Sequence, residues 1–356
     1  MATFRLGHIS DLHFSQTSDR LNPVDGPDTN SSLTVSIAAL AALMNGKGFR
    51  YPSTFKIDVA LGLLNAIPES FPDLDALVVT GDLATTGSDE DLIVAKNYFI
   101  GSVPPEWNPV GQVPSLQDEL GPQVICLPGN HDRYEGTAHR PSRGAFERHF
   151  GLDWDTINNG KTYSIAGADS RVKVAVPTKG DSALVMVLAD LSLQDYWSSE
   201  GATGWLGQGK ALPQVVRDMQ RSTRVAVAGA KGDGIKNVAP VWAIHFPPHF
   251  PNLTKNLKLL DSDELVDGAR NCGVDVLLAG HTHRMAAYSI VSPQAGNSRG
   301  GPTVYCCGAT TGISWHGRHT FSVLDIEVSG DKISHIRTRI YEWDKTKRLF
   351  VDGEWA

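Results

Sequence analysis

Short apolar runs, separated by glycine, proline and polar residues, dominate the pattern of this chain. The runs are rich in valine, isoleucine and leucine and span only a few residues each, which is typical of buried β-strands. We expect strands over residues 4–9, 74–79, 123–127, 184–189, 241–244, 274–279, 303–306, 321–328 and 333–341. Turn-forming residues at 329–332 separate the last two runs and predict an antiparallel hairpin.

Several segments between these strands have apolar residues at helical spacing. The spacing predicts helices over 33–44, 57–67, 92–99 and 263–272. We expect Ser88 to cap the third helix and Gly273 to end the fourth. Strands and helices alternate up to about residue 280, which favours βα units with strands buried on both faces. The predicted fold class is α/β: a four-layer αββα sandwich with two facing mixed β-sheets and helices outside.

Three segments rich in turn formers interrupt this pattern. We interpret 15–32, 101–122 and 195–234 as insertions whose roles stay open. The third carries Trp197 and Trp205, whose rings either stack on a substrate base or pack beneath the loops.

Five polar segments follow apolar runs directly. They are Asp11-Leu12-His13, Gly81-Asp82, Gly129-Asn130-His131-Asp132, His245, and Gly280-His281-Thr282-His283. Strands of a parallel sheet end at the same edge, so these segments are expected to meet at the carboxyl ends of the strands. Among their side chains are two Asp, one Asn and four His that would make a ligand set for two divalent cations.

Each segment taken alone has a plainer interpretation. A strand-end carboxylate such as Asp82 is often a turn former, and His245 alone is more often a satisfied polar residue than a ligand. Asp11 and His13 are two residues apart, a spacing that places both side chains on one side of an extended chain. The five segments in one chain favour the metal site.

The segments in order read D-x-H, G-D, G-N-H-D, a lone His and G-H-x-H, and over about residues 4–310 the chain resembles the calcineurin-like metallophosphoesterases. That resemblance implies one metal held by Asp11, His13, Asp82 and His283, and a second held by Asp82, Asn130, His245 and His281. It also implies that His131 is left free for chemistry. The mixed ligand set suits manganese, iron or zinc.

Two metals about 3.5–4 Å apart can bridge a hydroxide for in-line attack on phosphorus. His131 would then assist the leaving group, and Asp132 is a candidate to orient its ring. The predicted function is a metal-dependent phosphoester hydrolase, with phosphodiesters favoured because the motifs resemble the cyclic-nucleotide phosphodiesterase branch. A nuclease or a nucleotide-sugar or lipid pyrophosphatase is the alternative. A non-catalytic binding scaffold is less favoured, because Asp82 and His131 are both present.

Candidate substrate contacts lie near the last motifs. The lone-His segment reads His245-Phe246-Pro247-Pro248-His249, where relatives often carry adjacent histidines, so His249 is a rival ligand or a substrate contact. Trp315 and His316 follow the glycine-rich residues 308–312, which either line the pocket or form a plain connection.

The motifs are spread from Asp11 to His283, which predicts a single domain over 1–356. Residues 311–356 are expected to form a β-rich extension that packs on it. The aromatic residues of 331–356 form a dimer face or cover the sheet edge, and we favour the latter. The sequence itself defines no oligomeric state.

The net charge and the composition of the chain limit the kinds of partner that it is expected to bind. A net charge of −7 argues against stable binding of duplex nucleic acid, and bound metal would still attract a phosphoester, with a nucleotide-like substrate favoured. Four arginines after the G-N-H-D segment are candidates for a nuclease cleft or form part of a solvated helix face: Arg133, Arg140, Arg143 and Arg148.

The four cysteines show no CxxC spacing and are expected to be buried and free. No apolar stretch is long enough for a membrane span. We predict a cytoplasmic protein.

Overall fold

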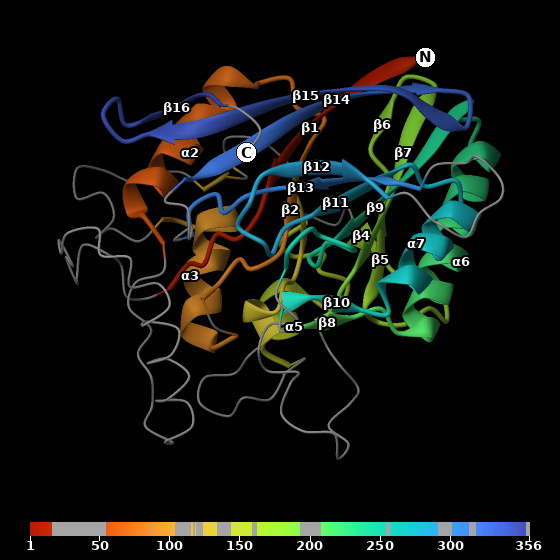
Figure 1. The fold of residues 1–356 in the computed structure, drawn as a ribbon, viewed down its shortest axis with the longest axis horizontal. Helices are drawn as coiled ribbons and strands as arrows, with labels where there is room; N and C mark the ends of the chain where they lie inside the picture. Colours follow the sequence, from red (N-terminus) through yellow and green to blue (C-terminus); the bar gives the residue numbers. More distant parts are fainter. Residues whose placement is uncertain are drawn as a thin grey trace.

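Two mixed β-sheets face each other in the computed structural model of the chain, with helices along both outer sides (Figure 1). The structure describes residues 1–15, 55–85, 87–103, 115–116, 118, 124–133, 144–158, 162–192, 208–253, 257–290, 301–312 and 318–353. This arrangement confirms the predicted α/β sandwich of two mixed sheets.

The first sheet has six strands in the order β16-β15-β14-β1-β2-β3. Its strands are β1 (Ala2–Ile9), β2 (Ala76–Thr80), β3 (Val124–Leu127), β14 (Thr320–Ser329), β15 (Lys332–Asp344) and β16 (Leu349–Asp352). The first three run parallel, and β14, from the far end of the chain, pairs with β1 antiparallel. β14 and β15 form the predicted hairpin, in which Gly330 adopts a φ of 63°.

The second sheet has eight strands, and β7, β9, β11 and β13 run parallel in its middle. Its strands are β4 (Thr162–Tyr163), β5 (Val172–Ala175), β6 (Thr178–Lys179), β7 (Ser182–Ala189), β9 (Asn237–Ile244), β11 (Val276–Ala279), β12 (Ala286–Ser289) and β13 (Thr303–Cys306). A separate pair consists of β8 (Gly209–Lys210) and β10 (Leu259–Leu260).

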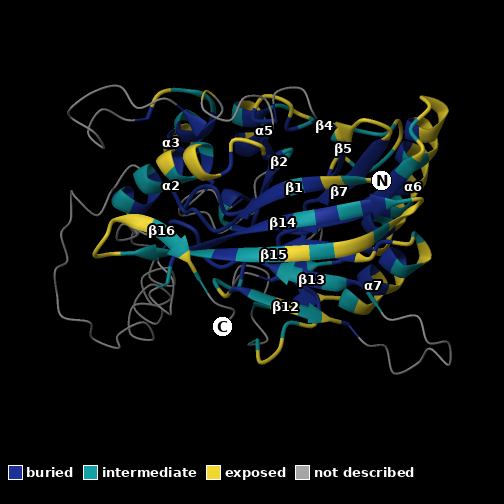
Figure 2. Ribbon diagram, turned by 90° about the horizontal axis from the view of Figure 1, so that it is seen from above, coloured by how far each residue is buried: buried dark blue, intermediate teal, exposed yellow. Residues whose placement is uncertain are grey.

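Strand residues of the second sheet alternate between two apolar cores. On β7, Leu184, Met186 and Leu188 point into the core shared with the first sheet. Val185 and Val187 point the other way, against the outer helices. Both faces of the strand are therefore buried, which explains why its sequence is continuously apolar and not alternating (Figure 2).

The helices flank the sheets. They are α2 (Ile57–Ser70), α3 (Asp89–Ile100), α5 (Gly144–Phe150), α6 (Pro213–Gly232), α7 (Ser262–Asn271) and the 3₁₀ turn η1 (His131–Arg133). α2 and α3 lie on the left in Figure 1, and α6 and α7 lie on the right. Ser88 caps α3 as predicted, because its Oγ accepts the N–H of Asp91 at 3.3 Å. Gly273 follows the end of α7 with a φ of 67°.

One predicted loop contains a helix. Residues 195–234 were interpreted as an insertion, but α6 occupies 213–232 and packs against β5, β7 and β9. Its buried residues Val215, Met219 and Ala226 form an apolar stripe that closes the outer core of the second sheet. Several predicted features lie outside the described residues. They are the helix at 33–44, most of the other two insertions, Trp197 and Trp205.

Candidate metal centre

Five strands end beside one another at the candidate site. β1, β2 and β3 come from the first sheet, and β9 and β11 come from the second. Ligand candidates follow each strand within one to four residues, and five of them have left-handed backbone: Asp11 (φ 53°), His13 (55°), Asp82 (52°), His281 (70°) and His283 (54°). Non-glycine residues rarely adopt this conformation, and its cost of about 1–3 kcal/mol per residue is tolerated mainly at functional sites.

The left-handed backbone corrects one sequence argument. Asp11 and His13 were expected to share a side because alternate residues of an extended strand do so. β1 ends at Ile9, and both residues lie beyond it in left-handed turns. Backbone N–H groups of Asp11 and His13 bind the carbonyl oxygens of Gly81 and Asp82 at 3.1 and 3.0 Å, which fixes the turn against the loop after β2.

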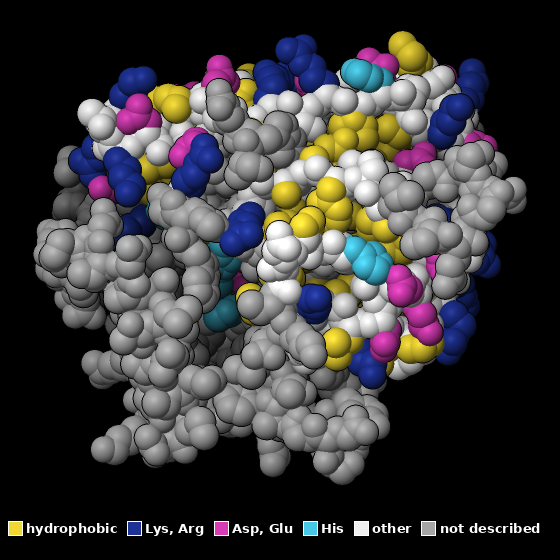
Figure 3. All heavy atoms as spheres, in the orientation of Figure 1, with side chains coloured by type: hydrophobic (Ala, Val, Ile, Leu, Met, Phe, Trp, Pro, Cys, Tyr) yellow, Lys and Arg dark blue, Asp and Glu magenta, His cyan; other side chains and the backbone are white. Residues whose placement is uncertain are grey.

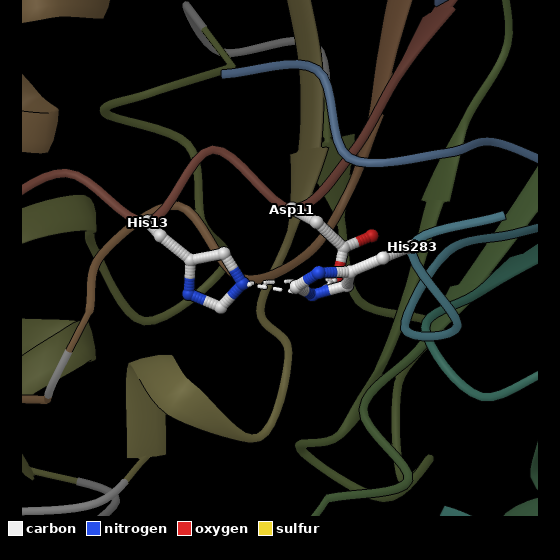
Figure 4. Close-up of side chains that lie close together, drawn as sticks. All are labelled: Asp11, His13 and His283. Atoms are coloured by element: carbon white, nitrogen blue, oxygen red, sulfur yellow. Dashed lines mark hydrogen bonds and ion pairs between the residues drawn. The ribbon is translucent and has the colours of Figure 1, made fainter. Parts of the chain in front are cut away.

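The first donor cluster is Asp11, His13 and His283, whose side chains converge in Figure 4. His283 Nε2 lies 3.3 Å from Asp11 Oδ1 and 3.2 Å from His13 Nε2. Asp11 is fully buried, and its Oδ1 accepts no hydrogen bond from the described residues. A buried carboxylate oxygen without a hydrogen bond is costly unless a cation neutralises it, so this cluster fits a metal ion.

The second donor cluster is Asp82, Asn130, His245 and His281. His245 Nε2 lies 3.3 Å from Asp82 Oδ2 and 3.1 Å from Asn130 Oδ1. His281 Nδ1 lies 3.1 Å from the same amide oxygen and 3.2 Å from His245 Nε2. Four donor atoms thus surround one point, and all four side chains are buried.

Asp82 connects the two clusters. Its Oδ2 lies 3.8 Å from His13 Nε2 and 3.3 Å from His245 Nε2. The carboxylate can therefore contact a cation in either cluster. Gly81 allows the His245 ring to lie close to the loop that carries Asp82, since a Cβ on Gly81 would lie 2.6 Å from His245 Nδ1. The φ of Gly81 is 97°, which also favours glycine.

The outward-facing ring nitrogens of two histidines bind backbone carbonyls. His245 Nδ1 lies 2.6 Å from Thr80 O, and His281 Nε2 lies 3.1 Å from Leu257 O. Such a bond fixes the tautomer and leaves the other ring nitrogen as the donor toward a metal. His245 therefore presents Nε2 to the cluster, and His281 presents Nδ1.

Burial and nearby charge set the protonation of these histidines. Burial lowers the pKa of His13 and of His281 to about 3, so both rings are neutral and ready to ligate. Burial also opposes the charge on His245, but the Asp82 carboxylate outweighs it and raises the pKa of His245 to about 9. A metal that binds His245 must displace that proton.

His131 lies at the edge of the clusters. Its ring centroid is 4.7 Å from that of His13, and its Nδ1 lies 2.8 Å from Thr85 O. Its backbone N–H donates to Asp82 Oδ1 at 2.8 Å. Thr85, which the sequence argument missed, therefore orients the ring.

Asp132, predicted to orient His131, has different partners. Its carboxylate accepts the backbone N–H groups of Leu83, Ala84 and Gly129 at 3.1, 2.8 and 2.8 Å. These bonds tie the loop after β3 to the loop after β2. Burial, together with the nearby Asp82 charge, raises the pKa of Asp132 to about 7.

Arg133 is buried and does not belong to a basic nucleic-acid cleft. Its guanidinium pairs with Asp190 and Glu147, each at 2.8 Å, and lies over the Phe146 ring. Asp190 directly follows β7, so this pair joins the G-N-H-D loop to the second sheet. Arg148 is exposed and pairs with Asp89, and Arg140 and Arg143 lie outside the described residues.

His249 does not join either donor cluster. Its Nε2 pairs with Asp263 Oδ1 at 3.0 Å, and its side chain is 39% exposed. The geometry thus favours His245 over its rival. Trp315 and His316 lie outside the described residues.

The cysteines mostly match the prediction. Cys126, Cys306 and Cys307 are free and buried as expected, whereas Cys272 is half-buried.

Residues 308–312 support the D-x-H turn. The N–H groups of Thr310 and Gly312 donate to the carbonyls of Ser10 and Asp11 at 2.9 and 3.0 Å. Thr311 Oγ1 donates to Leu12 O at 2.6 Å. This segment is therefore more than a plain connection, because it holds the backbone that carries Asp11 and His13.

Gly312 is expected to tolerate no side chain. A Cβ there would lie 2.5 Å from Asp11 O and 2.5 Å from His13 Cδ2. Gly312→Ala should lower the free energy of unfolding by about 1–3 kcal/mol and weaken metal binding. The matched control is Gly229→Ala on α6, where a Cβ meets nothing within 4 Å and a gain of about 0.5–1 kcal/mol is expected. Denaturant titration compares them, and equal stability of the two variants would refute the packing argument.

The fold and the site together define a class. A sandwich of two mixed sheets with histidines and carboxylates gathered at strand ends is a scaffold for metal-dependent chemistry. The family model described as calcineurin-like phosphoesterase matches residues 4–285, and the chain belongs to this family.

Solved structures with a similar fold are distant in sequence. A purple acid phosphatase from seeds of yellow lupin (Lupinus luteus) is 12% identical with a TM-score of 0.47, over 99% of this chain and 53% of that one. The calcineurin-like phosphoesterase YfkN from Bacillus subtilis is 12% identical with a TM-score of 0.38, over 95% and 90%. This chain spans about half the length of the lupin phosphatase. No curated protein matches the sequence.

None of the helices in the described part of the chain combines the length and the apolar character needed to span a membrane.

Proposed function

We propose that this chain is a binuclear metal-dependent hydrolase of phosphodiesters. The observation that carries the proposal is the pair of donor clusters sharing Asp82, with the His131 ring beside them. Asp11, His13, Asp82 and His283 would hold one cation, and Asp82, Asn130, His245 and His281 would hold the other. The mixed nitrogen and oxygen donors suit manganese, iron or zinc.

The residues of the chain have separate tasks in this reaction. When bound, two cations would supply a nucleophilic hydroxide at neutral pH and neutralise the phosphoryl oxygens. His131 is held through Nδ1 by the Thr85 carbonyl, so a protonated ring would donate its other proton from Nε2. As the new oxygen–phosphorus bond forms and the ester P–O bond breaks, His131 gives this proton to the leaving alkoxide. The products are a phosphomonoester and an alcohol.

Preference for diesters rests on the resemblance of the motifs to the cyclic-nucleotide phosphodiesterase branch. An alternative is hydrolysis of pyrophosphate-linked nucleotides, and it uses the same donor clusters. It gains support from a cavity beside His283 that two arginines line.

A substrate panel on one metal-analysed preparation tests the proposal. Metal-loaded protein should hydrolyse bis(p-nitrophenyl) phosphate faster than p-nitrophenyl phosphate, and removal of metal by a chelator should abolish both activities. Elemental analysis of the same sample gives the number and identity of the metals. No hydrolysis by protein shown to contain two metals per chain would refute the catalytic assignment.

A further inference from the structure

The side chain of Phe246 packs directly against the second donor cluster. Phe246 follows the candidate ligand His245 in the sequence, and its ring centroid lies 5.1 Å from that of His245 and 4.5 Å from that of His281. The interplanar angles are 82° and 52°, so one ring pair meets edge to face and the other is tilted. Aromatic rings attract one another at such separations and angles. Phe246 therefore contacts two of the four side chains of the second cluster.

This packing restricts a movement that the hydrogen bonds of the two histidines permit. The bonds from His245 Nδ1 to Thr80 O and from His281 Nε2 to Leu257 O each hold one ring nitrogen. A bond to one nitrogen leaves the tilt of the ring plane adjustable, and the tilt decides where the other nitrogen points. A rigid side chain packed against the ring limits that tilt, so Phe246 helps to direct both donor nitrogens.

The backbone of β8 supports the Phe246 ring. Phe246 belongs to the outer apolar core of the second sheet, together with Leu191, Ala211 and Leu259. A Cβ on Gly209 would lie 2.4 Å from Cδ2 and 2.6 Å from Cγ of Phe246, so a side chain at this position of β8 would force the ring to shift. Close contact with this backbone thus holds the ring at its position against the cluster.

Phe246 does not form part of the opening to the metal centre. In Figure 3, histidine side chains lie recessed in a hollow of the surface. Phe246, by contrast, has no exposed surface at all. It can therefore act on the reaction only through the ligands that it contacts. A buried phenylalanine that only fills the core would stabilise the fold without distinguishing one metal from the other.

We propose that Phe246 is a positioning residue for the second cation, because its ring sets the planes of His245 and His281. The inference rests on the proposed function and deepens it, since it concerns one cation of the same site. The apolar ring also excludes water from one side of each histidine, which favours nitrogen over water as the ligand. Both histidines belong to the second cluster, so loss of the ring should weaken one of the two metals selectively.

Titration of chelator-treated protein with Co²⁺ tests this selectivity. Calorimetry measures the dissociation constants, and visible absorption reports the ligands and geometry of the bound Co²⁺. Wild-type protein should bind two equivalents per chain. In Phe246→Leu, one equivalent should keep its dissociation constant, and the other should bind about 10-fold to 100-fold more weakly with an altered spectrum. Gly209→Ala displaces the ring without removing it and should weaken the same equivalent, also if Phe246→Leu does not fold.

Phe4→Leu is the matched control. Phe4 is fully buried as well, and it lies near the start of β1, at the strand end away from Asp11. Thermal unfolding should show a similar loss of stability in both Phe→Leu variants, whereas Phe4→Leu should keep both constants and the spectrum. Gly229→Ala gives the same comparison for Gly209→Ala. Wild-type constants in Phe246→Leu or Gly209→Ala would overturn the proposal, and so would equal weakening of both equivalents.

The titration also separates this inference from the proposed function. Selective weakening of one equivalent, in a protein that does not hydrolyse bis(p-nitrophenyl) phosphate, would refute the proposed function and support the role of Phe246. Hydrolysis without selective weakening would refute the role of Phe246 alone. Fewer than two equivalents bound by wild-type protein would overturn both.

Discussion

Replacing His131 with alanine is expected to lower kcat for phosphodiester hydrolysis by about 10²-fold to 10⁴-fold while the protein keeps its metals. His131 lies beside the donor clusters, and Thr85 O holds its ring. If it protonates the leaving oxygen, its loss should matter more for a poor leaving group. Steady-state rates on methyl p-nitrophenyl phosphate and on an alkyl diester, with metal content measured in parallel, check this.

His335→Ala is the control for the loss of a histidine as such. His335 is exposed on β15, and activity and metal content should both stay at wild-type levels. An equal rate loss for good and poor leaving groups would contradict a role in proton donation. Loss of a metal from His131→Ala would instead assign His131 as a ligand, since its ring belongs to a third possible donor group with His13 and Asp82.

Replacing Asp82 with asparagine is expected to abolish metal-dependent activity, a loss of about 10³-fold or more. Asparagine preserves the shape and an oxygen for the His131 N–H, but it removes the charge that both clusters share. Elemental analysis of the Asp82→Asn protein should show loss of metal from the two donor clusters. Wild-type protein at a metal concentration 100 times Kd gains about 2.7 kcal/mol of stability, and the variant should gain much less.

Asp331→Asn provides the comparison for Asp82→Asn. Its side chain is 61% exposed in a surface pair with Lys231, so metal content, activity and stabilisation by metal should not change. Full metal occupancy in Asp82→Asn would show that neither cluster depends on this carboxylate. That outcome would exclude Asp82 as the shared ligand.

The strands and the order of the motifs were predictable, and the reason is physical. Strands such as β7 and β11 are buried on both faces, so their sequences are unbroken apolar runs that end sharply at polar residues. The residue after such a run lies at a sheet edge. Asp82 and His281 follow β2 and β11 within two residues, so strand prediction alone brings them close to the site.

The remaining features depend on contacts that a linear pattern does not contain. α6 was missed because its glycines and charged residues hide the stripe of Val215, Met219 and Ala226, although these residues do have helical spacing. The partners of Asp132 and the carbonyl of Thr85 are backbone groups of other loops. Backbone groups carry no residue identity, and only the folded arrangement places them beside a particular side chain.

The position of β1 has a consequence for the order of assembly during synthesis. β1 is near the start of the chain, yet one of its two neighbours in the sheet is β14, at 320–329. The turn after β1 also depends on residues 310–312 for its hydrogen bonds. A ribosome makes these partners about 300 residues later. The contacts that complete the first donor cluster therefore form among the last. A nascent chain that lacks its final segments should not retain metal.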